Sequence, residues 1–345
     1  MNFSQSGTSG STQFCYESTP GSCPKSTFQV TARVPLYLFL GAVITVTLCG
    51  NLLVIISIAH FKQLHTPTHF LLLSLAAADF LLGLFVLPPS TIRSIENCWY
   101  FGDLFCKVHT STDFTLCTAS LWHMFFISID RYYAVCHPLR YRNKITVFVT
   151  VNMIFISWTL AAVIGFGLIF LELNKQGMED SYDNTDCIGS CFLALSAASA
   201  IITSILFFYI PGFVMICIYL KIFLVARRQA RSIRDTELQR QTAEEKKNTT
   251  SLKREMKAAR TLGITMGVFL VCWSPCFIYL NVDHAIQGSV PPILVDALIW
   301  FAYLNSAFNP FIYALFYKWF RKAFRVIIFC KIFQSNSSSI QLLSN

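Results

Sequence analysis

The sequence predicts an all-α membrane protein: a bundle of seven transmembrane helices followed by an amphipathic eighth helix. The composition is 54% hydrophobic and only 13% charged, with a mean hydropathy of +0.53, whereas soluble domains carry about 25% charged residues. Seven apolar segments are each long enough to cross a bilayer. Basic residues gather in those connections that would share one side of the membrane, which is the bias expected of cytoplasmic loops.

The chain divides into four parts. Residues 1–33 are polar, rich in Ser and Thr, and lack the apolar core of a signal peptide, so we expect an extracellular N-terminus and a first membrane helix that serves as the targeting signal. Residues 34–317 hold the seven spans, which we predict at 35–60, 68–93, 104–137, 147–171, 194–226, 256–284 and 292–316. Residues 318–330 place bases and apolar side chains at helical spacing, which predicts a helix lying on the inner membrane surface. The Ser-rich residues 331–345 predict a disordered cytoplasmic tail.

The net charge of +9 is distributed in a way that argues against a nucleic-acid partner. All but five of the 27 Lys and Arg fall in segments that we place inside, where they face anionic lipid and a cytoplasmic partner. The five exceptions are Lys25, Arg33, Arg93, Lys107 and Lys175. This bias predicts a multi-pass membrane protein with its N-terminus outside. Asn2 is then the only glycosylation sequon on the outer side.

The 13 cysteines sort by location. Six fall in or beside outer segments: Cys15, Cys23, Cys98, Cys106, Cys187 and Cys191. An oxidising compartment favours disulfides among them over a zinc site, because no CxxC pair or His cluster accompanies them. Six cysteines allow fifteen pairings, which the spacing does not resolve. Cys330, at the end of the amphipathic segment, is equally compatible with palmitoylation and with an ordinary free thiol.

The third span carries charge near both of its ends. Asp113 lies in its outer part and the triplet Asp130-Arg131-Tyr132 ends it, and such charges are costly in a membrane unless they are partnered. Asp113, Cys117 and Ser120 share one helix face by their spacing. We interpret that face as a path from an outer pocket to an inner switch.

Prolines recur inside the predicted spans, at positions 88, 89, 211, 275 and 310. Each frees a backbone carbonyl and bends its helix. Hinges for a conformational change and static kinks are equally compatible with this pattern.

An ordered set of motifs resembles the rhodopsin-like G-protein-coupled receptors across all seven spans. The matching residues are Gly50-Asn51, Leu75-Ala76-Ala77-Ala78-Asp79, Asp130-Arg131-Tyr132, Trp158, Pro211, Cys272-Trp273-Ser274-Pro275 and Asn309-Pro310-Phe311-Ile312-Tyr313. Within that class the chain resembles the trace amine-associated receptors, most of all their first subtype. That resemblance is carried by the runs at 61–68, 98–102, 258–264 and 305–310.

The resemblance implies a receptor for small protonated amines, with Asp113 as the ammonium anchor. Alkyl and arylethyl amines are cationic at pH 7, and a carboxylate attracts an ammonium strongly in a low-dielectric cleft. The other residues implied to line the pocket are Phe114, Cys117, Thr203, Ser204, Trp273, Phe277, Trp300 and Tyr303. Thr203 cannot hold a second ammonium, which favours monoamines, although both hydroxyls are equally compatible with bonds to their own helix. We expect Asp283 and Asp296, near the mouth, to be solvated, and the alternative is that they receive a second cation there.

Three further groups of residues follow from the resemblance. Asp79, Ser120, Asn305 and Asn309 are similar to the allosteric sodium site of this class, for which an ion-free hydrogen-bonded cluster is the alternative. Asp130, Arg131, Tyr132, Tyr209 and Tyr313 are similar to its G-protein switch. The implied disulfides are Cys106–Cys191, Cys15–Cys187 and Cys23–Cys98.

The implied partners are a heterotrimeric G protein of the stimulatory or olfactory type, which raises cyclic AMP, and arrestin. A serotonin- or histamine-type amine receptor is the alternative, since Asp113 serves those receptors equally. A transporter or channel would require paired half-helices or a charged path, and the central acids stop at Asp79 and Asp113. An opsin would need a lysine where Tyr303 stands. Catalysis has no support, because the chain shows no nucleophile–base arrangement and no metal ligand set.

Overall fold

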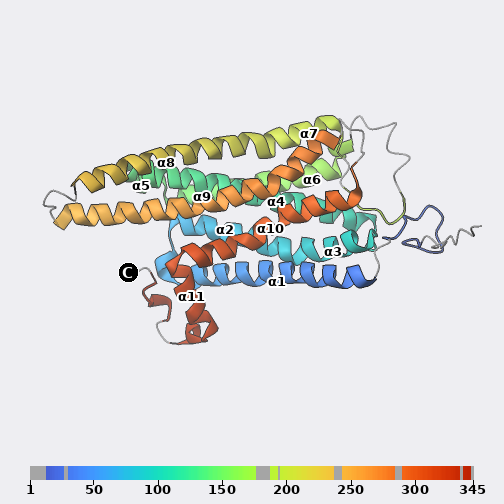
Figure 1. Cartoon of the computed structure of the whole chain (residues 1–345), viewed down its shortest axis with the longest axis horizontal. Coiled ribbons are helices and arrows are strands. Elements are labelled where there is room, and N and C mark those ends of the chain that lie inside the picture. The colour runs from blue at the N-terminus through green and yellow to red at the C-terminus, as the bar shows by residue number, and fades with distance from the viewer. Residues whose placement is uncertain are drawn as a thin grey trace, which may run out of the picture.

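The computed structural model describes residues 13–26, 30–175, 187–192, 195–236, 243–283, 290–334 and 337–342. Within these ranges the regular structure is helical, and the β pairings are two isolated bridges. The long helices run roughly parallel or antiparallel to one another in one bundle (Figure 1). The predicted helical bundle is confirmed.

Each predicted span is helical in the structure. The spans are α1 (Val30–His60), α2 (Pro67–Leu81) with η2 (Leu82–Val86) and α3 (Leu87–Glu96), α4 (Asp103–Cys136), α6 (Val147–Phe170), α7 (Ala197–Ser204) with η4 (Ile205–Tyr209) and α8 (Ile210–Thr236), α9 (Ala243–Asp283), and α10 (Pro292–Phe316). The connecting pieces are η1 (Lys62–Leu64), α5 (Pro138–Lys144) and η3 (Leu173–Lys175), and the chain continues into α11 (Lys318–Ile328), η5 (Lys331–Phe333) and η6 (Ser337–Ser339). The connection predicted at 227–255 is largely helical, and its residues 237–242 lie outside the described residues.

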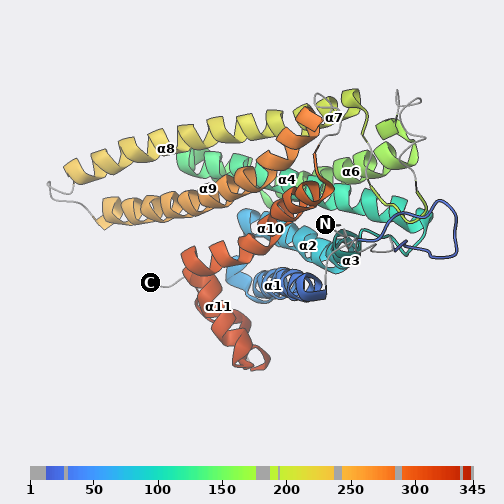
Figure 2. The same cartoon turned by 45° about the vertical axis from the view of Figure 1, so that its right-hand side comes forward.

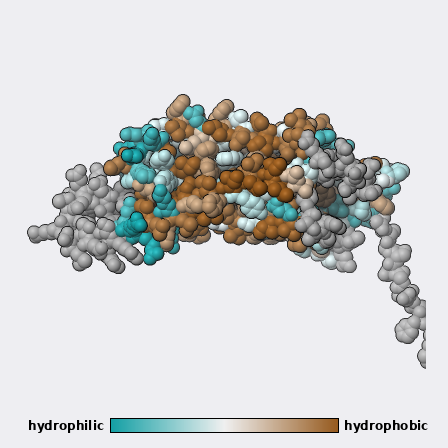
Figure 3. All heavy atoms as spheres, turned by 90° about the horizontal axis from the view of Figure 1, so that it is seen from above, coloured by the Kyte–Doolittle hydropathy of each residue, from teal (hydrophilic) through white to brown (hydrophobic). Residues whose placement is uncertain are grey.

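The surface of the bundle matches a membrane protein. Figure 3 shows apolar side chains gathered over the middle of the face in view and hydrophilic ones towards its ends. Five helical segments of the described chain are long and apolar enough to cross a membrane: α1, α2–α3, α6, α7–α8 and α9. The remaining two, α4 and α10, contain more polar residues because they supply the buried polar groups of the interior. Many of their polar side chains therefore lie inside the bundle rather than on its surface.

The third span is central in the packing. Helix α4 packs against α2, α6, α8 and α9, while α1 packs against α2 and α10. One polar junction joins three of these helices, since Ser74 on α2 bonds to Nε2 of His123 on α4 at 2.7 Å and accepts from Nε1 of Trp158 on α6 at 2.9 Å. Helices α8 and α9 run side by side beyond the other spans, and α11 turns away from α10 (Figures 1 and 2).

The Gly50-Asn51 motif compensates for Pro310 in the packing of α1 on α10. A proline has no N–H to donate to the carbonyl four residues earlier, which here is that of Ser306. The Nδ2 atom of Asn51 donates to this Ser306 carbonyl at 3.1 Å, so α1 satisfies a group that α10 cannot. A Cβ on Gly50 would lie 2.7 Å from Cβ of Pro310, so glycine is required for this approach.

Two of the predicted proline sites are preceded by π-helical turns. Segment η2 precedes Pro88 and Pro89. Segment η4 ends at Tyr209, directly before the Ile210-Pro211 pair that opens α8. The N–H of Leu87 bonds to the carbonyl of Leu82, and that of Ile210 to the carbonyl of Ile205, each five residues back. The wider turn is a common way for a helix to accommodate an interruption of its i to i−4 bonding.

The end of the bundle that was predicted to face outward is covered by residues 13–26, and here two predicted disulfides are wrong. The structure pairs Cys15 with Cys98 and Cys23 with Cys187, and it confirms Cys106 with Cys191. The reason is the register of the cap: the N–H of Cys23 donates to the carbonyl of Ile188 at 3.0 Å, and that of Ile188 to the carbonyl of Gly21 at 2.9 Å. These bonds place Cys23 beside Cys187 and leave Cys15 facing Cys98.

An ion pair also holds the cap. Nζ of Lys25 lies 2.8 Å from Oε2 of Glu96, the last residue of α3, and this bond raises the pKa of Lys25. Tyr37 and Tyr100 donate to the same Glu96 carboxylate, at 3.2 and 2.9 Å. The cap is therefore attached to α1, α3 and the loop that follows α3.

The described part of the tail is folded rather than disordered. Leu342 is fully buried and its N–H donates to Oε1 of Gln63 at 3.0 Å. Ser337 is buried and bonds to Nε2 of His60 at 3.0 Å. The expectation of disorder was wrong for these residues because an apolar side chain near the end of the tail packs into the inner end of the bundle. Helix α11 confirms the predicted amphipathic segment, with Trp319, Phe320 and Ala323 buried.

Candidate ligand pocket and inner switch

The carboxylate of Asp113 is half-buried on α4 and receives only neutral donors. The Tyr303 hydroxyl donates to Oδ2 at 2.6 Å and the Cys117 thiol to Oδ1 at 3.4 Å. None of the ion pairs among the described residues involves Asp113. A carboxylate withdrawn from water without a cationic partner is costly, so the site is suited to a ligand that brings the cation.

The aromatic residues predicted for the pocket contact one another or neighbouring rings, and Tyr303 among them bonds to Asp113. Phe114 packs edge-on against Phe207 with ring centroids 5.8 Å apart, and Phe277 stacks on Phe208 at 4.5 Å. Trp273 lies 5.9 Å from Phe277 and Trp300 lies 5.6 Å from Tyr303. The sequence reasoning missed Phe207 and Phe208, although they follow Thr203 and Ser204 by one helical turn.

The hydroxyls of the fifth span are directed into the protein. Thr203 is 4% exposed and Ser204 is fully buried. The Ser204 hydroxyl has no hydrogen-bond partner in the described structure, so it does not bond back to its own helix. A buried hydroxyl without a partner can donate to a polar group on a ligand.

A polar cluster surrounds Asp79 in the middle of the bundle. The carboxylate accepts hydrogen bonds from Ser306 at 2.8 Å, from Asn309 at 2.7 Å and from Ser120 at 3.4 Å. Asn305 is 2% exposed, but no described hydrogen bond joins it to Asp79. Ser306 was missed in the sequence because small hydroxyl residues are common inside membrane helices.

The cluster has the composition of a site for a hard cation. Oδ1 of Asn305 and Oδ1 of Asn309 are buried oxygen atoms without partners in the described structure. Oxygen ligands of this kind are those that small hard cations prefer. The residues present therefore fit a sodium ion, with the Asp79 carboxylate as the charged ligand.

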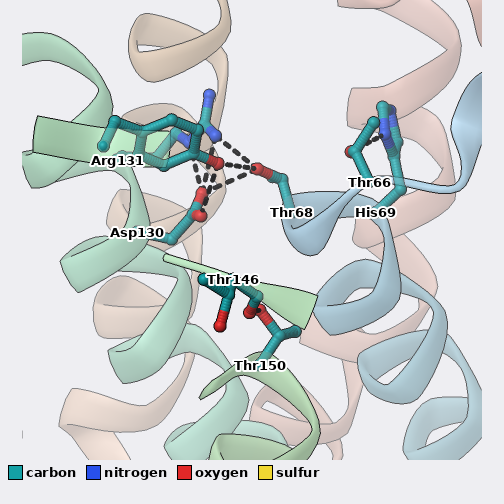
Figure 4. A network of polar contacts seen from close by, with 8 residues as sticks. Thr66, Thr68, His69, Asp130, Arg131, Thr146 and Thr150 are labelled. Carbon is teal, nitrogen blue, oxygen red and sulfur yellow. Dashed lines mark hydrogen bonds and ion pairs between the residues drawn. The ribbon is translucent and has the colours of Figure 1, made fainter. Parts of the chain in front are cut away.

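The inner end of α4 holds the predicted ion pair (Figure 4). Nη2 of Arg131 lies 2.6 Å from Oδ2 of Asp130, and both residues are at most 4% exposed. Two residues that the sequence did not identify complete the network. Thr68 donates to Oδ2 of Asp130 at 2.7 Å and is itself contacted by Arg131, and Tyr141 on α5 donates to Oδ1 at 2.9 Å.

The burial of Tyr141 and the nearby Asp130 raise the pKa of Tyr141 to about 12. Its hydroxyl therefore stays protonated at neutral pH and remains a donor. The network joins α2, α4 and α5, so it opposes separation of these elements at the inner face.

The three predicted switch tyrosines lie in different environments. Tyr313 is 1% exposed inside the bundle, and Tyr132 bonds to Nε2 of His137 at 3.2 Å. Tyr209 is 42% exposed, and its nearest polar neighbour is Asn281 at 3.5 Å, so its assignment to the inner switch is wrong. Tyr209 lies ten helical residues, or about 15 Å, from Tyr219, the residue of the same span that approaches Asp130 and Arg131. Tyr209 is therefore well outside the level of Arg131.

Tyr219 takes the place that was predicted for Tyr209. It packs against the inner core with Val135 and Ala259 and lies in electrostatic range of Asp130 and Arg131. A Cβ on Gly263 would come within 3.2 Å of its ring. The sequence offered one signal for Tyr219: it follows Pro211 by eight residues, which places it further along the same helix, toward the level of Arg131.

Two apolar grooves of about 660 and 550 Å³ lie between α9 and α10, lined by residues such as Pro275, Ile278, Phe308 and Phe311. Neither groove includes Asp113 or any other acid among its lining residues. Grooves of this composition suit lipid chains, so the polar chemistry stays with the interior sites.

The two predicted modification sites are Asn2 and Cys330. Asn2 lies outside the described residues. Cys330 is exposed at the end of α11.

Comparison with known proteins gives the family. Residues 50–313 match the model of the 7 transmembrane receptor (rhodopsin family). The chain is 52% identical to trace amine-associated receptor 1 of Macaca mulatta over 330 residues, covering 95% of this chain and 98% of the relative. The human protein of the same name is also 52% identical, with 95% and 97% covered. Trace amine-associated receptor 4 of Mus musculus is 46% identical, with 99% of each chain covered.

These relatives are receptors rather than enzymes, and the apolar helices agree with a multi-pass membrane protein. The chain belongs to the trace amine-associated receptors, within the rhodopsin family of seven-transmembrane receptors.

Proposed function

We propose that this receptor responds to small protonated monoamines, which bind through an ion pair with Asp113. The observation that carries the proposal is the Asp113 carboxylate itself, which is bonded to a hydroxyl and a thiol and has no cationic partner among the described residues. A ligand ammonium supplies that partner, and each charge then offsets part of the desolvation of the other. The surrounding rings add cation–π attraction and apolar contact.

The fifth span favours one amine group over two. Thr203 and Ser204 present hydroxyls where a second ammonium would need a carboxylate. The Ser204 hydroxyl, which lacks a partner, suits a ligand hydroxyl or another neutral polar group. A serotonin- or histamine-type specificity is the competing proposal, and a panel of simple alkyl and arylethyl amines tested beside serotonin and histamine separates the two.

The proposed output is activation of a stimulatory or olfactory G protein, with a rise in cyclic AMP. The buried Asp130–Arg131 pair supports a resting state in which Arg131 is withheld from a partner. An agonist that binds a second state better shifts the population towards it. In that state the inner face accepts the G protein, and afterwards arrestin.

The proposed orientation places the N-terminus outside the cell. The three disulfides cluster at the end of the bundle that carries the N-terminal cap, and disulfides persist in oxidising compartments. The basic residues of α5 and α11 lie at the other end, on the side expected for the cytoplasm. This orientation exposes Asn2 to glycosylation.

We also propose that sodium binds at Asp79 and favours the resting state. The unpaired oxygen atoms of Asn305 and Asn309 support this reading over an ion-free cluster. Sodium would neutralise the buried Asp79 charge, while Ser120, Ser306 and Asn309 orient the carboxylate.

The deciding experiment is a cyclic AMP dose–response over an amine panel with the wild-type receptor and Asp113→Asn. Activity with simple monoamines that disappears in the variant, at matched surface expression, supports the proposal. Equal potency in both receptors would remove Asp113 as the anchor. A response to agonist without a rise in cyclic AMP would contradict only the assigned G protein.

A further inference from the structure

Arg93, near the outer end of α3, is a buried cation with an unused donor. It is 9% exposed. Its Nη1 donates to the carbonyl of Cys191 at 3.3 Å, and the guanidinium lies 5.9 Å from the ring centre of Phe192. Its Nε has no hydrogen-bond partner, and no carboxylate of the described residues forms an ion pair with it. A buried charge with an unsatisfied donor is costly, so an acceptor that a ligand brings to this position removes that cost.

This cation lies next to the amine site. Ser94, the residue after Arg93, accepts a hydrogen bond from Trp300, whose ring centre lies 5.6 Å from that of Tyr303, and Tyr303 donates to Asp113. On α4, the Thr110 hydroxyl lies three residues before Asp113 and 4.0 Å from Sγ of Cys191, whose carbonyl accepts from Arg93. The pocket thus has a negative group on α4 and a positive group on α3, the latter beside the loop that Cys106–Cys191 fixes to the outer end of α4.

Asp296 does not fill the acceptor position. It accepts a hydrogen bond from Ser94 at 3.0 Å, and Ser94 in turn accepts from Nε1 of Trp300 at 3.1 Å. Asp296 is half-buried, so it is partly solvated and partly bonded within the protein. It lies in electrostatic range of Arg93 but outside ion-pair distance. It offsets part of the Arg93 charge at a distance and leaves the Nε–H free.

We propose that Arg93 is a second recognition residue of the amine pocket, which binds a carboxylate at the end of the ligand distant from its ammonium. The proposal rests on the proposed function, because the ammonium remains on Asp113. Arginine presents a planar set of donors that matches a carboxylate, and the free Nε–H supplies one of them. The preferred ligand class is an amine with a distant carboxylate, and a second ammonium at this end is repelled.

The test uses three compound series of matched length: ω-amino carboxylates, alkylamines and α,ω-diamines. Each is added to the purified full-length receptor, and affinity is read from thermal stabilisation, which rises with ligand occupancy. At the chain length that spans the two charges, the carboxylate is expected to bind at least about tenfold more tightly than the alkylamine, since charge-assisted bonds to arginine are among the stronger ones. The diamine is expected to be the weakest of the three.

The variants separate recognition from support of the fold. Arg93→Gln is expected to abolish the carboxylate preference and to improve the diamine, with a far smaller shift for the alkylamine. Arg93→Lys keeps the charge and is expected to retain part of the preference. Lys107→Gln, which removes an exposed cation paired with Glu172 at the same end of the bundle, is the matched control and should leave the order of the three series unchanged.

Two outcomes overturn the inference. One is a wild-type receptor that binds no carboxylate of any length more tightly than the matching alkylamine. The other is Arg93→Gln weakening all three series equally, which would assign Arg93 only to holding the Cys191 carbonyl. Failure of the proposed function is distinguishable, because alkylamines would then bind equally well to the wild-type receptor and to Asp113→Asn.

Discussion

The hydroxyl of Tyr303 on α10 donates a hydrogen bond of 2.6 Å to Oδ2 of Asp113 on α4. This bond joins two helices of the bundle, and the two residues are 190 positions apart in the sequence. It orients the carboxylate and leaves its other oxygen with only a weak thiol donor, Cys117 at 3.4 Å. A ligand ammonium therefore meets a carboxylate that is already positioned, which reduces the ordering cost of binding.

Replacing Asp113 by Asn is expected to reduce agonist potency at least about 30-fold. Truncating one partner of a buried, hydrogen-bonded charge pair costs roughly 2–5 kcal/mol. Asp103→Asn, which removes an exposed acid in the first turn of the same helix, is the matched control and should change potency little. The measurement is a cyclic AMP dose–response at equal surface expression.

Replacing Tyr303 by Phe is expected to weaken agonist binding by about tenfold, because a hydrogen bond to a charged group contributes about 1.5–3 kcal/mol. The double variant with Asp113→Asn should lose less than the sum of the two single effects, since the residues contact each other. Strictly additive losses would show that Tyr303 does not act through Asp113.

Sodium is expected to stabilise the resting receptor through Asp79. Replacing sodium by an organic cation at constant ionic strength should lower the melting temperature of the wild-type protein, since an ion that binds only the folded state stabilises it. Asp79→Asn should remove this difference, and Asp283→Asn should retain it. A sodium effect of equal size in Asp79→Asn would point to an ion-free cluster.

Thr68→Ala and Tyr141→Phe are each expected to raise signalling without agonist by about three- to tenfold. Each removes one donor to the buried Asp130 carboxylate, and a loss of about 0.5–1.5 kcal/mol from the resting state shifts the population accordingly. Thr66→Ala is the control, because Thr66 bonds to His69 outside this network (Figure 4). Basal cyclic AMP is measured against receptor number at the surface, and an unchanged value in both variants would exclude Thr68 and Tyr141 from the switch.

Peptide mapping under non-reducing conditions is expected to recover Cys15 linked to Cys98 and Cys23 linked to Cys187. In agreement, Cys15→Ser should free the thiol of Cys98 and leave that of Cys187 blocked. Recovery of a Cys15–Cys187 peptide would show that the cap takes another register.

The sequence determined the membrane architecture because two properties can be read directly along the chain. These are the length of each apolar segment and the side of the membrane on which Lys and Arg gather. Seven apolar segments, the bias of Lys and Arg, and the ordered motifs placed the spans on the observed helices. The largest differences are in α8, which continues to Thr236, and α9, which begins at Ala243, well beyond the predicted bounds of 226 and 256. The motif positions likewise predicted the Asp130–Arg131 pair and the acid at Asp113. A charged residue within a membrane span is energetically costly, so its presence there indicates a functional role.

Tertiary structure decided which groups meet across the bundle. Spacing along one helix could not show that Tyr219 rather than Tyr209 approaches the inner switch, that Ser306 joins the Asp79 cluster, or that Thr68 and Tyr141 share Asp130. The disulfide pairing depended on backbone bonds between Cys23, Ile188 and Gly21, and the buried position of Arg93 depended on the loop fixed by Cys191. These contacts join segments distant in the chain, and their partners are set by helix rotation and loop register, which neither hydropathy nor helical period records.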